Sequence, residues 1–407
     1  MNRSRSVLVT CVIGVLLVVS ACTGSPSSPG ASGGAVATTP ASVTPTPPAT
    51  QEAPEATPTA APTAPTSATP AATLDPTSYA LAERGPYHVG YRAGLTATDA
   101  SRGDRSVSVT VWYPAELPPG FSGDTAAVNA EPDRGGAPYP VILSSTVIAR
   151  RLAPLVVSHG FVWVSVDGID TYMAANPEMI QQPRDILFAL DMVASSPPAG
   201  LEGMADTDHA GVTGYSFDGY NTYALSGARI DPEYYLAQCP TPDATTEAIL
   251  GDQMSAFGCG PAKDWDAFAA KAGAAITTSD DGLWQPMTDP RIRAVMPMAG
   301  EGWWLFGERG LAAADRPTLI IAATGDDLYA ENALMFDHLG TQDKAFISFV
   351  GPDHMMILDP EMQARMAHFA AAFFGYHLQG REDLAWFFSE GFVSGHEELA
   401  WGAPAGR

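Results

Sequence analysis

A serine in a glycine-flanked turn is the residue of this chain best suited to chemistry. Ser216 follows Gly214 at the end of a short apolar run and precedes a stretch compatible with a helix. This arrangement is typical of a nucleophile elbow, in which a strand turns sharply into a helix and holds one serine hydroxyl above the sheet. The usual pattern is Gly-x-Ser-x-Gly, but Asp218 stands at the second glycine position and Gly219 comes one residue later. The sequence therefore predicts that Ser216 is a nucleophile in an altered elbow.

A serine hydroxyl is a weak nucleophile and needs a base to accept its proton, plus an acid to orient that base. His354 is the expected base, because it lies in a glycine-containing loop between the last predicted strand and the final predicted helix. His159 is expected in a helix-to-strand turn, and His209 begins the elbow strand at the end away from Ser216. The other histidines lie in segments typical of surface or helix positions: His88, His338, His368, His377 and His396.

Three acidic residues compete to orient His354. Asp326 ends a buried strand pattern at the turn that follows it, which favours this residue. Asp327 is adjacent, and the geometry of a turn lets only one of the two point inward. Glu301 follows the preceding predicted strand and could orient the histidine from the neighbouring position.

Apolar runs that alternate with helical patterns predict the elements that position these residues. Polar and apolar residues alternate over 106–114, as in a strand with one solvated face. Further strands are expected at 140–144, 162–167, before Ser216, and at 292–296, 318–323 and 345–350, with helices at 149–157, 177–195, after the elbow and at 361–375. This alternation predicts an α/β fold with a mainly parallel sheet covered by helices on both faces.

The segment 230–288 interrupts the alternation. It is too long for a simple connection, and it contains several aromatic residues. We therefore expect a cap over the strand ends that shapes the substrate pocket. A surface insertion without such a role is the alternative.

The four cysteines divide into two pairs. Cys11 lies in a predicted export signal and Cys22 at its end, so Cys239 and Cys259 remain in the folded part. An isolated pair in an exported protein favours a disulfide. Cys and His do not cluster at metal-ligand spacing, so we expect no structural zinc, and we expect no cofactor.

Residues 1–22 have the pattern of an export signal. Arg3 and Arg5 precede an apolar run over 7–19 that is short for a transmembrane helix, and small residues follow. The ending at Cys22 resembles the lipobox of bacterial lipoproteins, in which the cysteine is lipidated and becomes the new N-terminus. An ordinary cleaved signal and a weak membrane anchor are the alternatives.

Residues 23–75 consist mostly of Pro, Thr, Ala, Ser and Gly. Such a segment cannot bury enough apolar surface to offset its ordering entropy. We expect a disordered tether there, a folded domain over 79–407, and a protein held outside the cytoplasm by a lipid on Cys22.

The chain carries a formal net charge of −24. Such a surface repels phosphate backbones, so we expect no nucleic-acid partner. We expect a monomer that meets the membrane only through its lipid anchor.

Several motifs resemble those of a known family. Segments 87–90, 109–114, 214–217, 289–295 and 353–355 are similar, in content and order, to the dienelactone-hydrolase-like and platelet-activating-factor-acetylhydrolase-like branch of the α/β-hydrolases. The strand before Asp326 is also similar to that of bacterial cutinases and polyester hydrolases. The resemblance covers about residues 85–380.

This resemblance implies the α/β-hydrolase fold and serine esterase chemistry. The chain order Ser216, Asp326, His354 is the order of the catalytic triad in that fold. In the acetylhydrolases the acid follows the earlier strand, which keeps Glu301 open as the alternative acid.

One loop departs from the family pattern. Relatives carry a His-Gly-rich turn that donates an oxyanion-hole amide, whereas residues 144–151 contain no glycine. Acyl transfer needs two donors, and losing one costs about a hundred- to a thousand-fold in rate. We expect the Phe217 amide to be one donor and the amide of Thr146 or a neighbour to be the other.

These observations predict hydrolysis of a small-molecule or lipid-like carboxylic ester through an acyl-enzyme intermediate. The altered oxyanion loop and Asp218 motivate a rival hypothesis, a catalytically silent protein that uses the fold for binding. Peptidase action is a third hypothesis, which the absence of a separate substrate-anchoring segment in the sequence disfavours.

Overall fold

The computed structural model describes residues 74–403, except 123–124, 170–174 and 252. The predicted export signal, Cys22 and nearly all of the predicted tether lie outside the described residues. Within the described ranges, no helix has the length and apolar character needed to cross a membrane.

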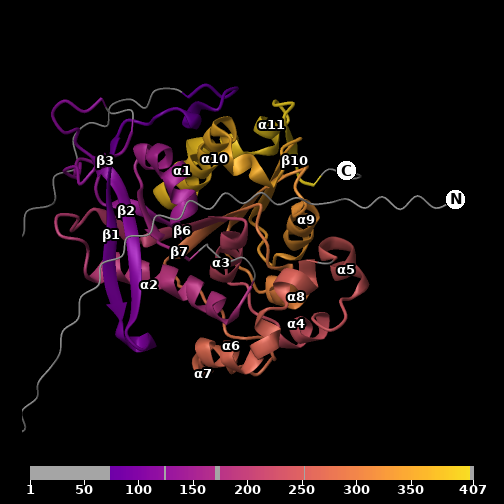
Figure 1. The fold of residues 1–407 in the computed structure, drawn as a ribbon. Coiled ribbons are helices and arrows are strands. Elements are labelled where there is room, and N and C mark those ends of the chain that lie inside the picture. Colours follow the sequence, from indigo (N-terminus) through magenta and orange to yellow (C-terminus); the bar gives the residue numbers. More distant parts are fainter. Residues whose placement is uncertain (1–73, 123–124, 170–174, 252, 404–407) are drawn as a thin grey trace, which may run out of the picture. The chain divides into compact units, whose positions relative to one another are not determined.

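A ten-stranded sheet forms the centre of the described domain (Figure 1). Its order is β10-β9-β8-β7-β6-β4-β5-β2-β1-β3, and the six strands from β9 to β5 are parallel. β10 pairs antiparallel with β9, and β2 and β1 extend the other end in antiparallel pairing. The strands are β1 (His88–Asp99), β2 (Arg105–Ala115), β3 (Ala127–Val128), β4 (Tyr139–Ser145), β5 (Val162–Val166), β6 (Ala205–Tyr215), β7 (Ile292–Met298), β8 (Thr318–Ala323), β9 (Lys344–Phe349) and β10 (Leu399–Trp401).

Helices cover both faces of this sheet. Along β4, Ile142 packs in one buried cluster while Val141 and Leu143 pack in another, because successive strand residues point to opposite faces. The first face is covered by α1 (Thr146–Val156) and α10 (Pro360–Gln379). The other face is covered by α2 (Gln182–Ser195), α3 (Phe217–Leu225), α8 (Trp303–Leu311) and α9 (Tyr329–His338). This confirms the predicted α/β class and the mainly parallel sheet.

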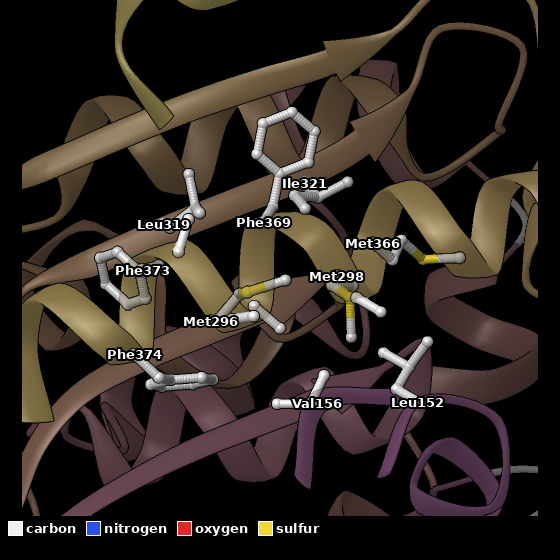
Figure 2. Close-up of a cluster of buried hydrophobic side chains, with 14 of the residues drawn as sticks. Leu152, Val156, Met296, Met298, Leu319, Ile321, Met366, Phe369, Phe373 and Phe374 are labelled. Carbon is white, nitrogen blue, oxygen red and sulfur yellow. The ribbon is translucent and has the colours of Figure 1, made fainter. Parts of the chain in front are cut away.

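Figure 2 shows how the first face is filled. Side chains of α1 and α10 meet the inward residues of β7 and β8, and all are buried. The labelled residues are Leu152, Val156, Met296, Met298, Leu319, Ile321, Met366, Phe369, Phe373 and Phe374. This packing fixes the carboxyl ends of β7 and β8, which lead into the turns that hold Glu301 and Asp326.

The sequence did not predict β1. Its pairing with β2 shifts register between Arg92 and Leu95, next to Gly94 at φ 68°. A bulge of this kind breaks the two-residue alternation by which a strand is recognised. α1 also begins earlier than expected, directly after β4, so that the altered oxyanion loop is itself the first turn of a helix.

All regular secondary structure that the structure describes in the segment 230–288 is helical. It contains α4 (Pro232–Gln238), α5 (Ala244–Leu250), a helical turn at Met254–Gly258, another at Pro261–Asp264, α6 (Trp265–Ala272) and α7 (Ala274–Thr277). A disulfide joins Cys239 and Cys259, which confirms that prediction. An aromatic cluster packs the segment against Trp304 of α8; its members are the buried Tyr235, Phe268, Trp284 and Trp304 and the partly buried Trp265.

Candidate active site

Ser216 lies in a sharp turn between β6 and α3. Its backbone has φ 59° and ψ −126°, a conformation that residues other than glycine rarely adopt. A strained backbone of this kind persists only where the surrounding structure enforces it. Here β6 ends at Tyr215 and α3 begins at Phe217, so the hydroxyl-bearing residue alone makes the turn.

The two glycines of the elbow are required by close packing. A Cβ on Gly214 would lie 2.3 Å from the carbonyl oxygen of Asp218. A Cβ on Gly219 would lie 2.4 Å from the Cα of Gly300, in the turn after β7. Gly219, one position later than the usual pattern places it, therefore lets α3 approach the turn after β7.

Three predicted residues form one hydrogen-bonded chain. The Nε2 atom of His354 lies 2.8 Å from the Ser216 hydroxyl oxygen, and its Nδ1 lies 2.8 Å from Oδ2 of Asp326. The Asp326 side chain is buried, with 1% exposed, whereas that of His354 is 35% exposed. The imidazole thus stands between a buried carboxylate and an accessible hydroxyl.

Two further contacts hold the loops that carry this chain. The Leu328 amide donates to Oδ1 of Asp326 at 2.9 Å, so both carboxylate oxygens are engaged. The Tyr215 hydroxyl donates to the His354 carbonyl at 2.6 Å and fixes the backbone beneath the imidazole. A strand residue next to Ser216 therefore sets the position of the base.

The structure distinguishes among the three acidic residues that were candidates to orient His354. Asp326 bonds to His354, whereas Asp327 is exposed to solvent. Glu301 lines the same cavity as His354 but makes no hydrogen bond to it in the described structure. The carboxylate that orients the imidazole here is that of Asp326.

Asp218 has a structural partner that the sequence did not reveal. It is buried, and its Oδ2 accepts a hydrogen bond from the Ser145 amide at 2.9 Å. Its Oδ1 accepts another from Asn221 at 2.9 Å, and Asn221 also donates to Gln182. The aspartate therefore joins the start of α3 to the end of β4, beside a helix N-terminus where a carboxylate is favoured.

The two predicted oxyanion donors begin two helices. Phe217 is the first residue of α3 and Thr146 is the first residue of α1. The first amides of a helix have no intrahelical acceptor, so they can donate hydrogen bonds to an oxygen that develops negative charge. The Ser145 amide is already bonded to Asp218, which leaves Thr146 as the candidate on this loop. The Thr146 hydroxyl is occupied by Asp167 and Ser165, so its side chain is held in place.

A cavity of about 320 Å³ opens beside His354. It is lined by Gln253, Phe257, Glu301, Asp326, Asp327, Leu328 and His354. Gln253 and Phe257 belong to the segment 230–288, so this segment supplies one wall. Two larger hollows, of about 480 and 620 Å³, are lined by none of the three hydrogen-bonded residues and lie apart from this chemistry.

Three of the other histidines lie in different surroundings. His209 lies against Asp206 at the start of β6, and His159 bonds to the carbonyl groups of Leu81 and Glu83. His368 is fully buried, and burial lowers its pKa to about 3. Among the described residues, no group of three or more His, Cys, Asp or Glu side chains could hold a metal ion.

Sequence reasoning missed Glu331, which lies in α9 behind the cavity. Its carboxyl group is buried and accepts hydrogen bonds from two backbone amides next to Glu301. The signal in the sequence is the adjacent polar pair Glu331 and Asn332 within an otherwise mixed helix pattern, five residues after Asp326.

Neither a scan against models of protein families nor a search of curated proteins finds a match for this chain. The functional argument therefore depends on the geometry of the site.

Proposed function

We propose that this protein is a serine hydrolase of the α/β-hydrolase fold that cleaves carboxylic esters. The observation that carries the proposal is the continuous chain from Ser216 through His354 to Asp326, with Ser216 at a positive φ between a strand and a helix. A nucleophile, a base within hydrogen-bond reach and an acid that orients the base are the parts that acyl transfer requires.

In the first half-reaction the Ser216 oxygen attacks the acyl carbon as His354 Nε2 accepts the hydroxyl proton. The tetrahedral intermediate collapses with cleavage of the ester C–O bond, and the imidazolium returns its proton to the departing alcohol. Water then attacks the acyl-enzyme with His354 again as base, which releases the carboxylic acid and regenerates Ser216. Asp326 keeps the Nδ1 proton directed toward itself and stabilises the imidazolium.

The amides of Phe217 and Thr146 are the proposed oxyanion donors. Asp218 supports this arrangement because it holds the Ser145 amide and so fixes the backbone just before Thr146. Stabilisation of the developing oxyanion by fixed donors usually lowers the barrier to acyl transfer more than any other single effect. The carboxylate that breaks the elbow pattern is, in this proposal, a positioning residue for the second donor.

The aromatic ring of Phe257 in the cavity wall suits an ester with an apolar group. Export and a lipid on Cys22 remain part of the proposal, and they rest on the sequence pattern of residues 1–22. Such an anchor would leave the hydrolase outside the cytoplasm at the end of a Pro- and Thr-rich tether.

Labelling by a fluorophosphonate probe, together with turnover of short p-nitrophenyl esters, tests the proposal. We expect both for the folded protein, and both should disappear in Ser216→Ala, with turnover reduced by more than about a thousand-fold. A wild-type protein that is folded yet neither labelled nor active would instead support the silent binding protein.

A further inference from the structure

Two glutamates lie together behind the proposed catalytic chain. Glu301 is in the turn between β7 and α8, and Glu331 is in the first turns of α9. Both line one small cavity, and Glu301 also lines the more open cavity that contains His354. Glu301 thus connects a buried carboxyl group with the space where substrate would lie.

Glu331 is held firmly but only through one oxygen. Its Oε1 accepts hydrogen bonds from the amides of Gly302 and Trp303, both at 2.9 Å. The residue is 1% exposed, and its Oε2 is buried without a hydrogen-bond partner among the described residues. A buried carboxylate oxygen without a partner is costly, so the neutral, protonated form of Glu331 is favoured.

The described surroundings of these two carboxyl groups are acidic or neutral. Asp326 faces the pair from the loop after β8, Tyr223 faces it from α3 and Tyr234 from α4. Asp327 and His354 line the open cavity with Glu301. Among the described residues, no ion pair is found for Glu301 or Glu331.

Burial and like charge therefore favour the protonated form. Burial raises the pKa of Glu301 well above its usual range, and the charges of Glu331 and Asp326 raise it further, although the nearby indole of Trp304 opposes the shift. Burial also raises the pKa of Glu331 to about 7, although the two backbone amides oppose the shift. Two neighbouring carboxyl groups in such a site cannot both ionise easily.

We propose that Glu301 carries a proton at neutral pH, because the carboxyl groups of Glu331 and Asp326 lie near it, and that its neutral carboxyl group donates a hydrogen bond into the substrate cavity. This inference rests on the proposed esterase function. The substrates it favours are uncharged esters that carry an additional acceptor oxygen, such as an ether or carbonyl oxygen, close to the reacting acyl group. Glu301 is then a specificity residue rather than a member of the triad.

The pH dependence of kcat/KM gives the first test. As Glu301 loses its proton, it becomes a carboxylate, which cannot donate and which repels the developing oxyanion. We expect an alkaline decline in the wild-type protein that is absent in Glu301→Gln, because an amide stays neutral. Glu331→Gln should move the decline to lower pH by about one unit, because it removes the like charge. The exposed Glu308→Gln in α8 is the matched control and should keep the wild-type profile.

A matched pair of substrates tests the ligand class. p-Nitrophenyl methoxyacetate and p-nitrophenyl butyrate differ by one ether oxygen in place of a methylene group. The ratio of their kcat/KM values should fall about three- to tenfold in Glu301→Met and stay near the wild-type value in Glu301→Gln, because one neutral hydrogen bond is lost only in the former. An unchanged ratio in Glu301→Met would overturn the assignment.

An infrared measurement tests whether these glutamates are protonated, without relying on activity. The carboxylic acid C=O band of the wild-type protein at pH 7 should be lost in the Glu301→Gln/Glu331→Gln double variant and retained in Glu308→Gln. A band of equal intensity in the double variant would show that both groups are ionised in the native protein and would refute the inference. If the protein gives that infrared result but is labelled by a fluorophosphonate, only the inference about Glu301 fails and the esterase proposal stands. If the protein is not labelled, the esterase proposal fails whatever the infrared result.

Discussion

The turn after β7 and the loop after β8 lie next to each other, and each presents an acidic residue to the cavity beside His354. Asp326 bonds to the imidazole and to a backbone amide, so its carboxylate faces a group that would become cationic in the proposed reaction. Glu301 lines a cavity with another carboxyl group, that of Glu331, and no cation pairs with it among the residues that the structure describes. The partner of an acid, more than its position at the sheet edge, therefore decides its chemistry.

The sharpest test of this comparison removes each charge in turn. Asp326→Asn should lower kcat about 10⁴-fold, because the amide favours the wrong imidazole tautomer and cannot stabilise the imidazolium. Glu301→Gln should change kcat at pH 7 by less than about tenfold, because only a neutral hydrogen bond is altered. Steady-state kinetics on a p-nitrophenyl ester measures both. The opposite ranking would make Glu301 the triad acid.

Asp218 is another acid at this edge, and its partners include the backbone amide of Ser145. Asp218→Ala leaves the Ser145 amide without its acceptor and frees the backbone before Thr146. We expect kcat to fall about a hundred-fold through the loosened oxyanion donor, and stability to fall by about 1–3 kcal/mol. Kinetics and urea denaturation measure these effects, with exposed Asp337→Ala in α9 as the control. Full activity in Asp218→Ala would separate this carboxylate from the oxyanion site.

The smallest effect concerns the pH dependence of stability. Folding raises the pKa of Glu331 from 4.5 to about 7, so the folded protein binds this proton more tightly than the unfolded chain does. The contribution to stability is therefore fully present below about pH 4.5 and is lost as the pH rises through about 7. We expect Tm to decline over this window in the wild-type protein and to decline less in Glu331→Gln. An equal decline in the two proteins would contradict a protonated Glu331.

Much of the fold was predictable, because its signals are local. Apolar runs such as 318–323 and helical spacing over 177–195 report burial within a few residues, and the observed β8 and α2 lie in these segments. β1 escaped prediction because a bulge disturbs its alternation. The three residues of the hydrogen-bonded chain were also predictable, since each follows a strand in the order Ser216, Asp326, His354.

The α/β class, the disulfide partners and the candidates Ser216, Asp326 and His354 could be predicted from the sequence, because turn residues, strand periodicity and a single remaining cysteine pair are visible there. The folded structure was needed to show which acid bonds to His354, what Asp218 binds, and that Glu301 and Glu331 line one cavity. Each of these depends on groups that come from separate elements. Ser145 and Asp218, which share a hydrogen bond, are 73 positions apart, and Gly302 and Glu331 are 29 apart. Such contacts arise when packed strands and helices fix the distance between their ends, and no local pattern encodes that distance.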